Sequence, residues 1–145
     1  MKEDSIKILS KTFISPVDGE TIHYAQNQRK ESLIEYVVVH DLFEYHRRHF
    51  ELFEYLKMKK KPQNVTWLDL KGHGLSGGRR YYIDDFEEYV RDFCFLVKNI
   101  IKSKNIVIVG HGVGALVAVK ALDEIQEKKN VMGMILSNPP LRLSF

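Results

Sequence analysis

The chain has 145 residues, 44% of them hydrophobic and 28% charged, with a formal net charge of +3. This length and composition predict a single domain spanning residues 1–145, large enough to bury a core. The apolar runs are too short for a membrane-spanning helix, and the small, dispersed net charge argues against nucleic-acid binding. The charged start Met1–Asp4 lacks the apolar segment of a signal peptide, and Cys94 is the single cysteine. We therefore expect a cytoplasmic protein without an internal disulfide.

Strand-like and helix-like segments alternate along the chain, which predicts an α/β fold. We expect a mostly parallel sheet of about six strands with helices on both faces. The strands are expected at residues 11–15, 21–25, 36–39, 65–70, 106–109 and 131–136, and Asp18-Gly19 indicates a hairpin turn between the first two. The run Tyr36–Val39 is rich in β-branched residues, as expected of a strand buried on both faces.

Three helices are expected between these strands. The first, at 46–59, places Phe50, Phe53 and Leu56 on one side, has lysines near its end and stops before Pro62. The second begins at Asp84, which forms a capping-box pattern with Glu87. The third, at 113–127, is apolar nearly all round, which predicts a buried helix.

The glycine turn between the strand at 106–109 and the third helix admits three interpretations. Gly110, Gly112 and Ala115 fit the dinucleotide pattern G-x-G-x-x-A, but no carboxylate follows in 134–138 to hold a ribose. The turn also fits a nucleophile elbow, G-x-S-x-G, in which Gly112 replaces the serine and Gly110 and Gly114 allow strand and helix to approach closely. The third interpretation is a tight turn without chemistry.

Four segments in the order of a known family favour the elbow. They are His40–Tyr45 with Arg48, Asp69 with Gly72–Gly78, Ile83–Val90, and Val107–Gly114. Together they resemble the monoacylglycerol lipase and lysophospholipase group of the α/β-hydrolase fold, also described as serine-aminopeptidase-like. The resemblance covers about residues 10–140, and its second segment, matching D-x-R-G-H-G-x-S-x-G, is the most specific.

The resemblance implies the strand order 1-2-4-3-5-6 and hydrolysis of a small ester such as a monoacylglycerol or lysophospholipid. It places the oxyanion-binding N–H groups at Leu42 and Val113. It also assigns structural roles in the surrounding turns, without metal or cofactor, to His40, Gly72, His73, Gly74, Gly110, His111 and Gly114.

Several departures from the family pattern bear on activity. Gly112 stands at the nucleophile position, Asp41 and Phe43 replace glycines, and Tyr45 replaces a histidine. The family's cap, its catalytic acid and histidine, and its last two strands belong to a second half that has no counterpart here. We therefore expect a truncated hydrolase core that is inactive by itself.

Three functions remain open. The chain is an inactive hydrolase retained to bind a lipid-like ester, an active esterase half completed by a second chain, or a G-x-G-x-x-A dinucleotide-binding protein. The strand from Val131 to Leu136 is apolar on both faces. As a sheet edge it would favour self-association or pairing with a second hydrolase half.

Three other features have simpler interpretations. Ser76 lies in Gly74-Leu75-Ser76-Gly77-Gly78, which matches G-x-S-x-G, but no helix follows at once, so we expect a structural loop. His46 and His49 are one helical turn apart without a third metal ligand, and we expect them on a solvated helix face. Cys94 is expected to be a buried, unreactive thiol.

Overall fold

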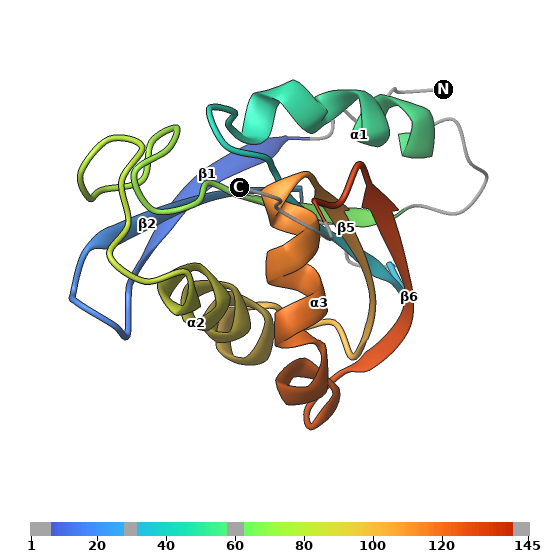
Figure 1. Cartoon of the computed structure of the whole chain (residues 1–145). Helices are drawn as coiled ribbons and strands as arrows, with labels where there is room; N and C mark the ends of the chain where they lie inside the picture. The colour runs from blue at the N-terminus through green and yellow to red at the C-terminus, as the bar shows by residue number, and fades with distance from the viewer. Residues whose placement is uncertain (1–6, 28–31, 58–62, 141–145) are drawn as a thin grey trace.

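The computed structural model describes residues 7–27, 32–57 and 63–140, which form one six-stranded sheet covered by helices (Figure 1). The strands are β1 (Ile8–Ile14), β2 (Thr21–Asn27), β3 (Glu35–Val39), β4 (Asn64–Leu68), β5 (Asn105–His111) and β6 (Asn130–Ser137). Their order across the sheet is β1-β2-β4-β3-β5-β6, which confirms the expected order.

The sheet is mixed, so the expectation of a mostly parallel sheet holds only in part. Strands β4, β3, β5 and β6 run parallel, whereas β1 pairs antiparallel with β2, and β2 antiparallel with β4. The turn between β1 and β2 contains Gly19 at φ 80°, and the Glu20 N–H donates to the Asp18 carboxylate at 3.1 Å. This confirms the predicted hairpin. The carboxyl ends of the parallel strands meet at one edge of the sheet, where ligands bind in open α/β folds.

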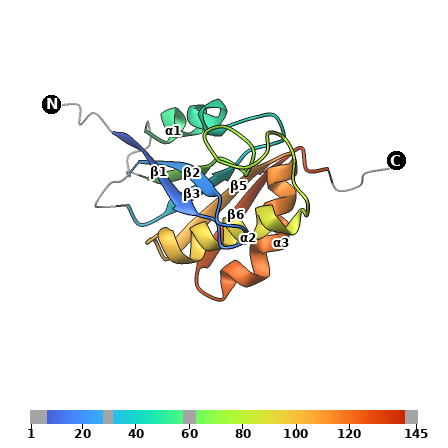
Figure 2. The same cartoon turned by 90° about the vertical axis from the view of Figure 1, so that its left-hand side faces the viewer.

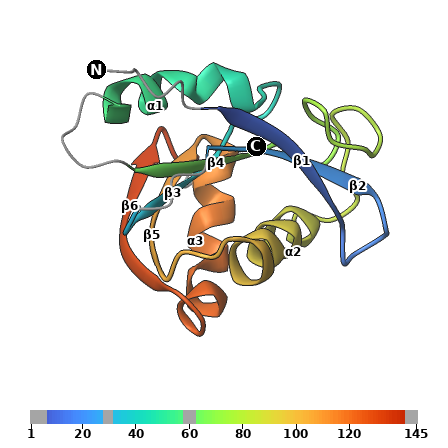
Figure 3. The same cartoon turned by 180° about the vertical axis from the view of Figure 1, so that it is seen from behind.

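The helices cover both faces of the sheet, as expected. A 3₁₀ turn, η1 (His46–His49), leads into α1 (Phe50–Lys57) on one face. On the other face lie α2 (Glu87–Phe95), its π-helical extension η2 (Leu96–Ile100) and α3 (Val113–Gln126), as Figures 1 and 3 show. The larger core lies between the sheet and α2 and α3, and the smaller core lies under α1, where Trp67 is fully buried.

Three expectations about the helices need correction. The first helix begins with a 3₁₀ turn at His46, and its expected end at Lys59 lies outside the described residues. The second begins at Glu87: Asp84 accepts a hydrogen bond from the Tyr82 hydroxyl, and it is Asp85 that accepts one from the Glu87 N–H. No capping box forms, because Asp84 precedes the first helical turn by too many residues to reach its N–H groups.

The helix α3 buries one side and exposes the other. Val117, Ala118, Ala121 and Ile125 are fully buried against the sheet and α2, whereas the Val119 side chain is 45% exposed. The expectation of a helix buried all round is therefore wrong for the described residues. Figure 2 shows α3 beside β6, the strand at the edge of the sheet. Among the described residues, no helix is long and apolar enough to span a membrane.

Candidate functional site

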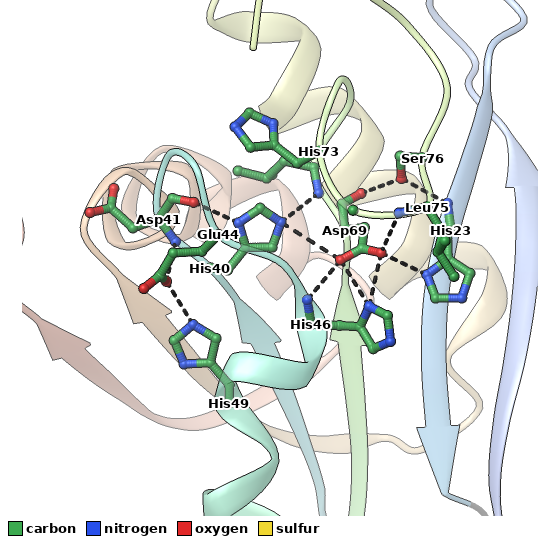
Figure 4. Close-up of polar contacts among 12 residues, drawn as sticks. His23, His40, Asp41, Glu44, His46, His49, Asp69, His73, Leu75 and Ser76 are labelled. Atoms are coloured by element: carbon green, nitrogen blue, oxygen red, sulfur yellow. Dashed lines mark hydrogen bonds and ion pairs between the residues drawn. The ribbon is translucent and has the colours of Figure 1, made fainter. Parts of the chain in front are cut away.

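Loops from three parallel strands converge at one edge of the sheet (Figure 4). His40 and Asp41 follow β3, Asp69 follows β4, and Gly112 follows β5. The residues that the sequence pointed to after these strands therefore lie close together. This convergence follows from the parallel arrangement, because β3 is hydrogen-bonded to β4 on one side and to β5 on the other.

The turn at Gly112 joins β5 to α3 in a backbone conformation that side chains rarely adopt. Gly112 has φ 54° and ψ −122°. A Cβ at Gly110 would lie 2.6 Å from the Ala115 Cα, and a Cβ at Gly114 would lie 2.3 Å from the Val39 carbonyl oxygen. The small residues at 110 and 114 thus allow the close approach of helix and strand that an elbow requires. The strained backbone at 112 is the geometry that presents a nucleophile in elbows.

The Asp41 carboxylate fills the space beside this turn. Its Oδ1 accepts hydrogen bonds from the backbone N–H of Leu42 at 2.8 Å and of Val113 at 2.7 Å. A Cβ built on Gly112 would lie only 2.0 Å from the Asp41 Cγ. The carboxylate therefore occupies the volume that a side chain at 112 would need. It also accepts from both N–H groups at which we expected oxyanion binding.

The loop after β3 is held by a neutral histidine. Burial lowers the pKa of His40 to about 4, so the ring is uncharged at neutral pH. Its Nδ1–H donates to the Asp41 carbonyl at 2.7 Å, and its Nε2 accepts the Leu70 N–H at 3.0 Å. The Phe43 backbone in the same loop adopts φ 61°, a conformation suited to glycine, although the residue is phenylalanine.

Asp69 is the centre of a buried hydrogen-bond cluster. Its carboxylate is within 2.9 Å of both His23 Nδ1 and His46 Nδ1, and it accepts the N–H groups of His46 at 2.7 Å and Leu75 at 3.0 Å. Burial opposes ionisation, but the bonds from the two histidines outweigh it and hold the pKa of Asp69 well below its usual range. The cluster ties β2, the β3–η1 loop and the β4 loop together.

This cluster corrects the expectation that His46 lies on a solvated helix face. His46 is buried, and His23, His46 and Asp69 bring three possible metal ligands within 4.8 Å of one another. Yet both Nδ1 atoms are already directed at the same carboxylate oxygen, and that oxygen also accepts a backbone N–H. A metal ion would have to displace these bonds, so the geometry fits a structural cluster better than a metal site. Sequence spacing gave no signal of it, because the three residues come from different segments.

His49 is also not simply solvated. Its Nε2 lies 2.9 Å from the Glu44 carboxylate, and its ring packs against that of His111, with 5.8 Å between ring centroids. Burial works against ionisation of Glu44, but the hydrogen bond from His49 and one from the Asp41 N–H lower its pKa. His111 Nδ1 in turn lies 3.1 Å from the Ser137 hydroxyl. A second group of polar side chains thus borders the turn at Gly112.

The loop after β4 is held by buried polar side chains. Ser76 is buried, donates its hydroxyl to the Asp69 carbonyl at 2.7 Å and accepts the His23 N–H at 2.9 Å. His73 is fully buried and its Nδ1–H donates to the Lys71 carbonyl at 2.9 Å. Gly72 and Gly74 both have positive φ, and a Cβ at Gly74 would lie 2.3 Å from the Asp69 carboxylate. Glycine at 74 is therefore needed for the Asp69 cluster to close.

Cys94 lies away from these loops, on α2. Burial raises the pKa of its thiol to about 12, which fits the expected unreactive cysteine. A cavity of about 270 Å³ opens beside it, bordered by residues of α2 and η2, by Pro16 after β1 and by Glu124 of α3. None of the residues at the strand ends borders this cavity.

Comparisons with known proteins agree with this architecture. The sequence matches the family model of serine aminopeptidase S33 over residues 33–144. An esterase of Pyrococcus furiosus is similar in structure, with 23% identity and a TM-score of 0.75 over 96% of this chain and 54% of that one. A comparison with curated proteins gives no match.

Two further solved structures share the fold at lower identity. The haloalkane dehalogenase DbeA of Bradyrhizobium elkani has 15% identity and a TM-score of 0.74, over 92% of this chain and 42% of that one. The N-formylmaleamic acid deformylase of Pseudomonas putida has 19% identity and a TM-score of 0.69, over 92% and 48%. The chain spans about half the length of these solved structures.

Proposed function

The chain belongs to the serine aminopeptidase S33 family of α/β hydrolases, and on this premise we propose that it is a hydrolase-fold protein that does not hydrolyse esters by itself. The observation that carries the proposal is Gly112 at the apex of the strand-to-helix turn, where its backbone has the strained conformation of an elbow. In a serine hydrolase, an oxygen at this position attacks the carbonyl and a histidine takes its proton. Glycine offers no such oxygen.

The oxyanion side of the machinery supports the same proposal. The N–H groups of Leu42 and Val113 converge on one oxygen atom, as they must to stabilise a tetrahedral intermediate. That oxygen belongs to Asp41, so a substrate carbonyl finds the position filled. The ligand class of the ancestral site, by resemblance of the motifs at residues 40–48 and 69–78, is a small lipid-like ester such as a monoacylglycerol or lysophospholipid.

Completion by a second chain is a further candidate, favoured by the exposed edge strand β6. Met132 and Ile135 of β6 are 55% and 51% exposed, and the chain spans about half the length of the solved structures it matches. A partner that supplied further strands, a histidine and an acid would still leave Gly112 without an oxygen. We therefore propose that such an assembly binds ligand and turns it over only if the partner also brings the nucleophile.

The dinucleotide interpretation gains no support. A pyrophosphate at the start of α3 would meet the Asp41 carboxylate, which already accepts the Val113 N–H. The strand β6 ends at Ser137, without a carboxylate to hold a ribose hydroxyl.

Hydrolysis of short p-nitrophenyl esters by the purified chain tests the proposal. We expect no turnover above buffer, because Gly112 offers no nucleophile and Asp41 fills the oxyanion pocket. An open pocket without a triad would still accelerate hydrolysis about 10³–10⁴-fold over water. A Ser76→Ala variant is assayed in parallel. Enzyme-like turnover that disappears in this variant would move the nucleophile from the elbow to Ser76 and overturn the proposal.

A further inference from the structure

The two N–H groups at the elbow form a pocket that already holds an anion. The groups come from different segments, Leu42 after β3 and Val113 at the first residue of the 14-residue helix α3, yet both donate to Asp41 Oδ1. Two N–H donors at 2.7–2.8 Å from one oxygen match the geometry of an oxyanion site. The positive end of the α3 dipole also favours a negative charge at this position.

The space occupied by Asp41 is that of the missing side chain at 112. A Cβ on Gly112 would lie 2.0 Å from Asp41 Cγ and 2.2 Å from each carboxylate oxygen. Because atoms cannot approach so closely, the carboxylate requires glycine at 112. The Asp41 carboxylate thus occupies two positions of the elbow. It fills the space of a side chain at 112, and its Oδ1 lies where a substrate oxyanion would bind.

The loop around the pocket has supports that do not depend on the carboxylate. The His40 ring donates to the Asp41 carbonyl at 2.7 Å and accepts the Leu70 N–H at 3.0 Å, which fixes the loop to the end of β4. The Asp41 N–H donates to the Glu44 carboxylate at 3.3 Å. The Gly112 N–H donates to the Ser137 carbonyl at 2.9 Å, which holds the other side of the pocket. Removing the Asp41 side chain therefore leaves both N–H donors in place and open to an external ligand.

We propose that the N–H groups of Leu42 and Val113 form a carboxylate-binding pocket, that Asp41 occupies it from within the chain, and that a glycine at 41 opens it to a free small carboxylate. In the native chain this internal occupancy keeps ester carbonyls and carboxylate products out of the pocket. The inference concerns anion binding and is independent of whether the chain turns over an ester.

Acetate is the probe, because it reproduces the carboxylate and methylene of Asp41. Native protein, Asp41→Gly and Asp41→Asn are labelled with ¹⁵N and titrated with sodium acetate at constant ionic strength, with sodium chloride and acetamide as matched additives. The readouts are the amide signals of Leu42 and Val113 and the melting temperature. Asp41→Asn is the control variant, since its amide oxygen has the same shape and accepts the same two N–H groups.

We expect saturable shifts of both amide signals in Asp41→Gly alone, together with a rise of its melting temperature with acetate. A ligand of four heavy atoms does not bind more tightly than about 0.05 mM by the usual ligand-efficiency ceiling, so the titration covers the millimolar range. The native protein and Asp41→Asn should bind acetate at least tenfold more weakly.

Three results would overturn the inference. They are an Asp41→Gly protein whose two amides do not respond, equal binding by the native protein, and equal shifts with chloride or acetamide. Asp41→Ala is carried as a second variant, because it removes the carboxylate but keeps a Cβ. If neither variant folds, the pocket does not stand without Asp41 and the proposal fails.

Discussion

Position 112 has no side chain, but the space of that side chain is filled. The Asp41 carboxylate lies where a residue-112 Cβ would project, so the two positions are chemically coupled although they are far apart in the sequence. The functional consequence is that neither residue can be interpreted alone. The space beside Gly112 is not empty, because the Asp41 carboxylate fills it. Asp41 is not a surface residue without contacts, because its carboxylate accepts two backbone N–H groups.

Gly112→Ser should destabilise the protein without creating a hydrolase. The positive φ at 112 alone imposes strain of about 1–3 kcal/mol on a non-glycine residue. The clash with Asp41 adds to it. Urea unfolding of the native protein, Gly112→Ser, Asp41→Gly and the double variant measures both effects. We expect serine to lower the free energy of unfolding by at least about 1 kcal/mol more when Asp41 is present.

The same four proteins are treated with a fluorophosphonate probe. No adduct at position 112 is expected, because a serine without a neighbouring general base is a weak nucleophile at neutral pH. Equal destabilisation by serine in both backgrounds would contradict the coupling between 41 and 112. A strong adduct at 112 would indicate a base near the turn. His111, which precedes Gly112, and His49, whose ring packs against that of His111, are the histidines to examine.

At the scale of elements, the strands were more predictable from sequence than the contacts between loops. The β-branched run at Val37–Val39 and the alternation of strands and helices predict a buried α/β sheet, and the resemblance supplies the strand order. The Asp41 contact was not predictable, because Asp41 and Val113 are 72 residues apart and only the folded sheet brings them together. His46 was misassigned for the same reason: its partner Asp69 follows a different strand, which the local helical pattern does not reveal.

The close packing of α3 on β3 gives a prediction at this scale. Gly114→Ala places a Cβ 2.3 Å from the Val39 carbonyl oxygen and 2.6 Å from that of His40. Both are backbone atoms that cannot turn away, so α3 must shift. We expect a loss of about 1–3 kcal/mol in the free energy of unfolding, which outweighs the roughly 1 kcal/mol gained in helix propensity.

Gly133→Ala in β6 is the matched control for this substitution. A Cβ there meets nothing within 4 Å, and the variant should unfold at the same urea concentration as the native protein or slightly above it. If Gly114→Ala were as stable as Gly133→Ala, the close approach of α3 to β3 would be wrong.

At the scale of the whole molecule, two buried groups have opposite effects on stability between about pH 4 and 6.5. Burial lowers the pKa of His40 from 6.5 to about 4. The unfolded chain then binds more protons in this window, so His40 makes stability rise with pH. Burial raises the pKa of Asp92 from 3.8 to about 6, although the Ser15 hydroxyl donates to it. The folded chain then binds more protons, so Asp92 makes stability fall as pH rises.

Asp92→Asn should therefore remove the opposing effect of Asp92, so that stability rises with pH as the His40 shift predicts. The amide does not titrate but still accepts the Ser15 hydroxyl. We expect the free energy of unfolding of the variant, relative to that of the native protein, to increase by about 2 kcal/mol from pH 4 to pH 6.5. Urea unfolding at several pH values measures the free energy of unfolding of both proteins. Subtracting one pH curve from the other removes the contributions of the titrating groups that both proteins share. Parallel pH curves would mean that Asp92 is ionised throughout this range.

The edge strand β6 gives a prediction about assembly. Among the described residues it pairs only with β5, and it exposes Met132 and Ile135. Unpaired backbone groups beside apolar side chains promote edge-to-edge association. We expect the chain to self-associate at about 100 µM in sedimentation experiments, and Ile135→Lys to shift it towards monomer because a charged side chain disfavours edge pairing.

Leu75→Lys is the control, since it adds the same charge at a side chain that is 65% exposed on a distant loop. It should leave association unchanged. A native chain that sediments as a monomer, or an equal effect of both lysines, would argue against β6 as the contact.

The exchange of places between Asp41 and Gly112 also has an evolutionary consequence. A mutation to serine at 112 alone brings its side chain onto the carboxylate, and a mutation to glycine at 41 alone leaves two N–H groups without their acceptor. Each single reversal passes through a less stable protein. A lineage that carries both residues can place a hydroxyl at 112 without this loss only by changing both codons. If the proposed function holds, the pair therefore makes a return to a serine at 112 hard, whichever of the two residues came first.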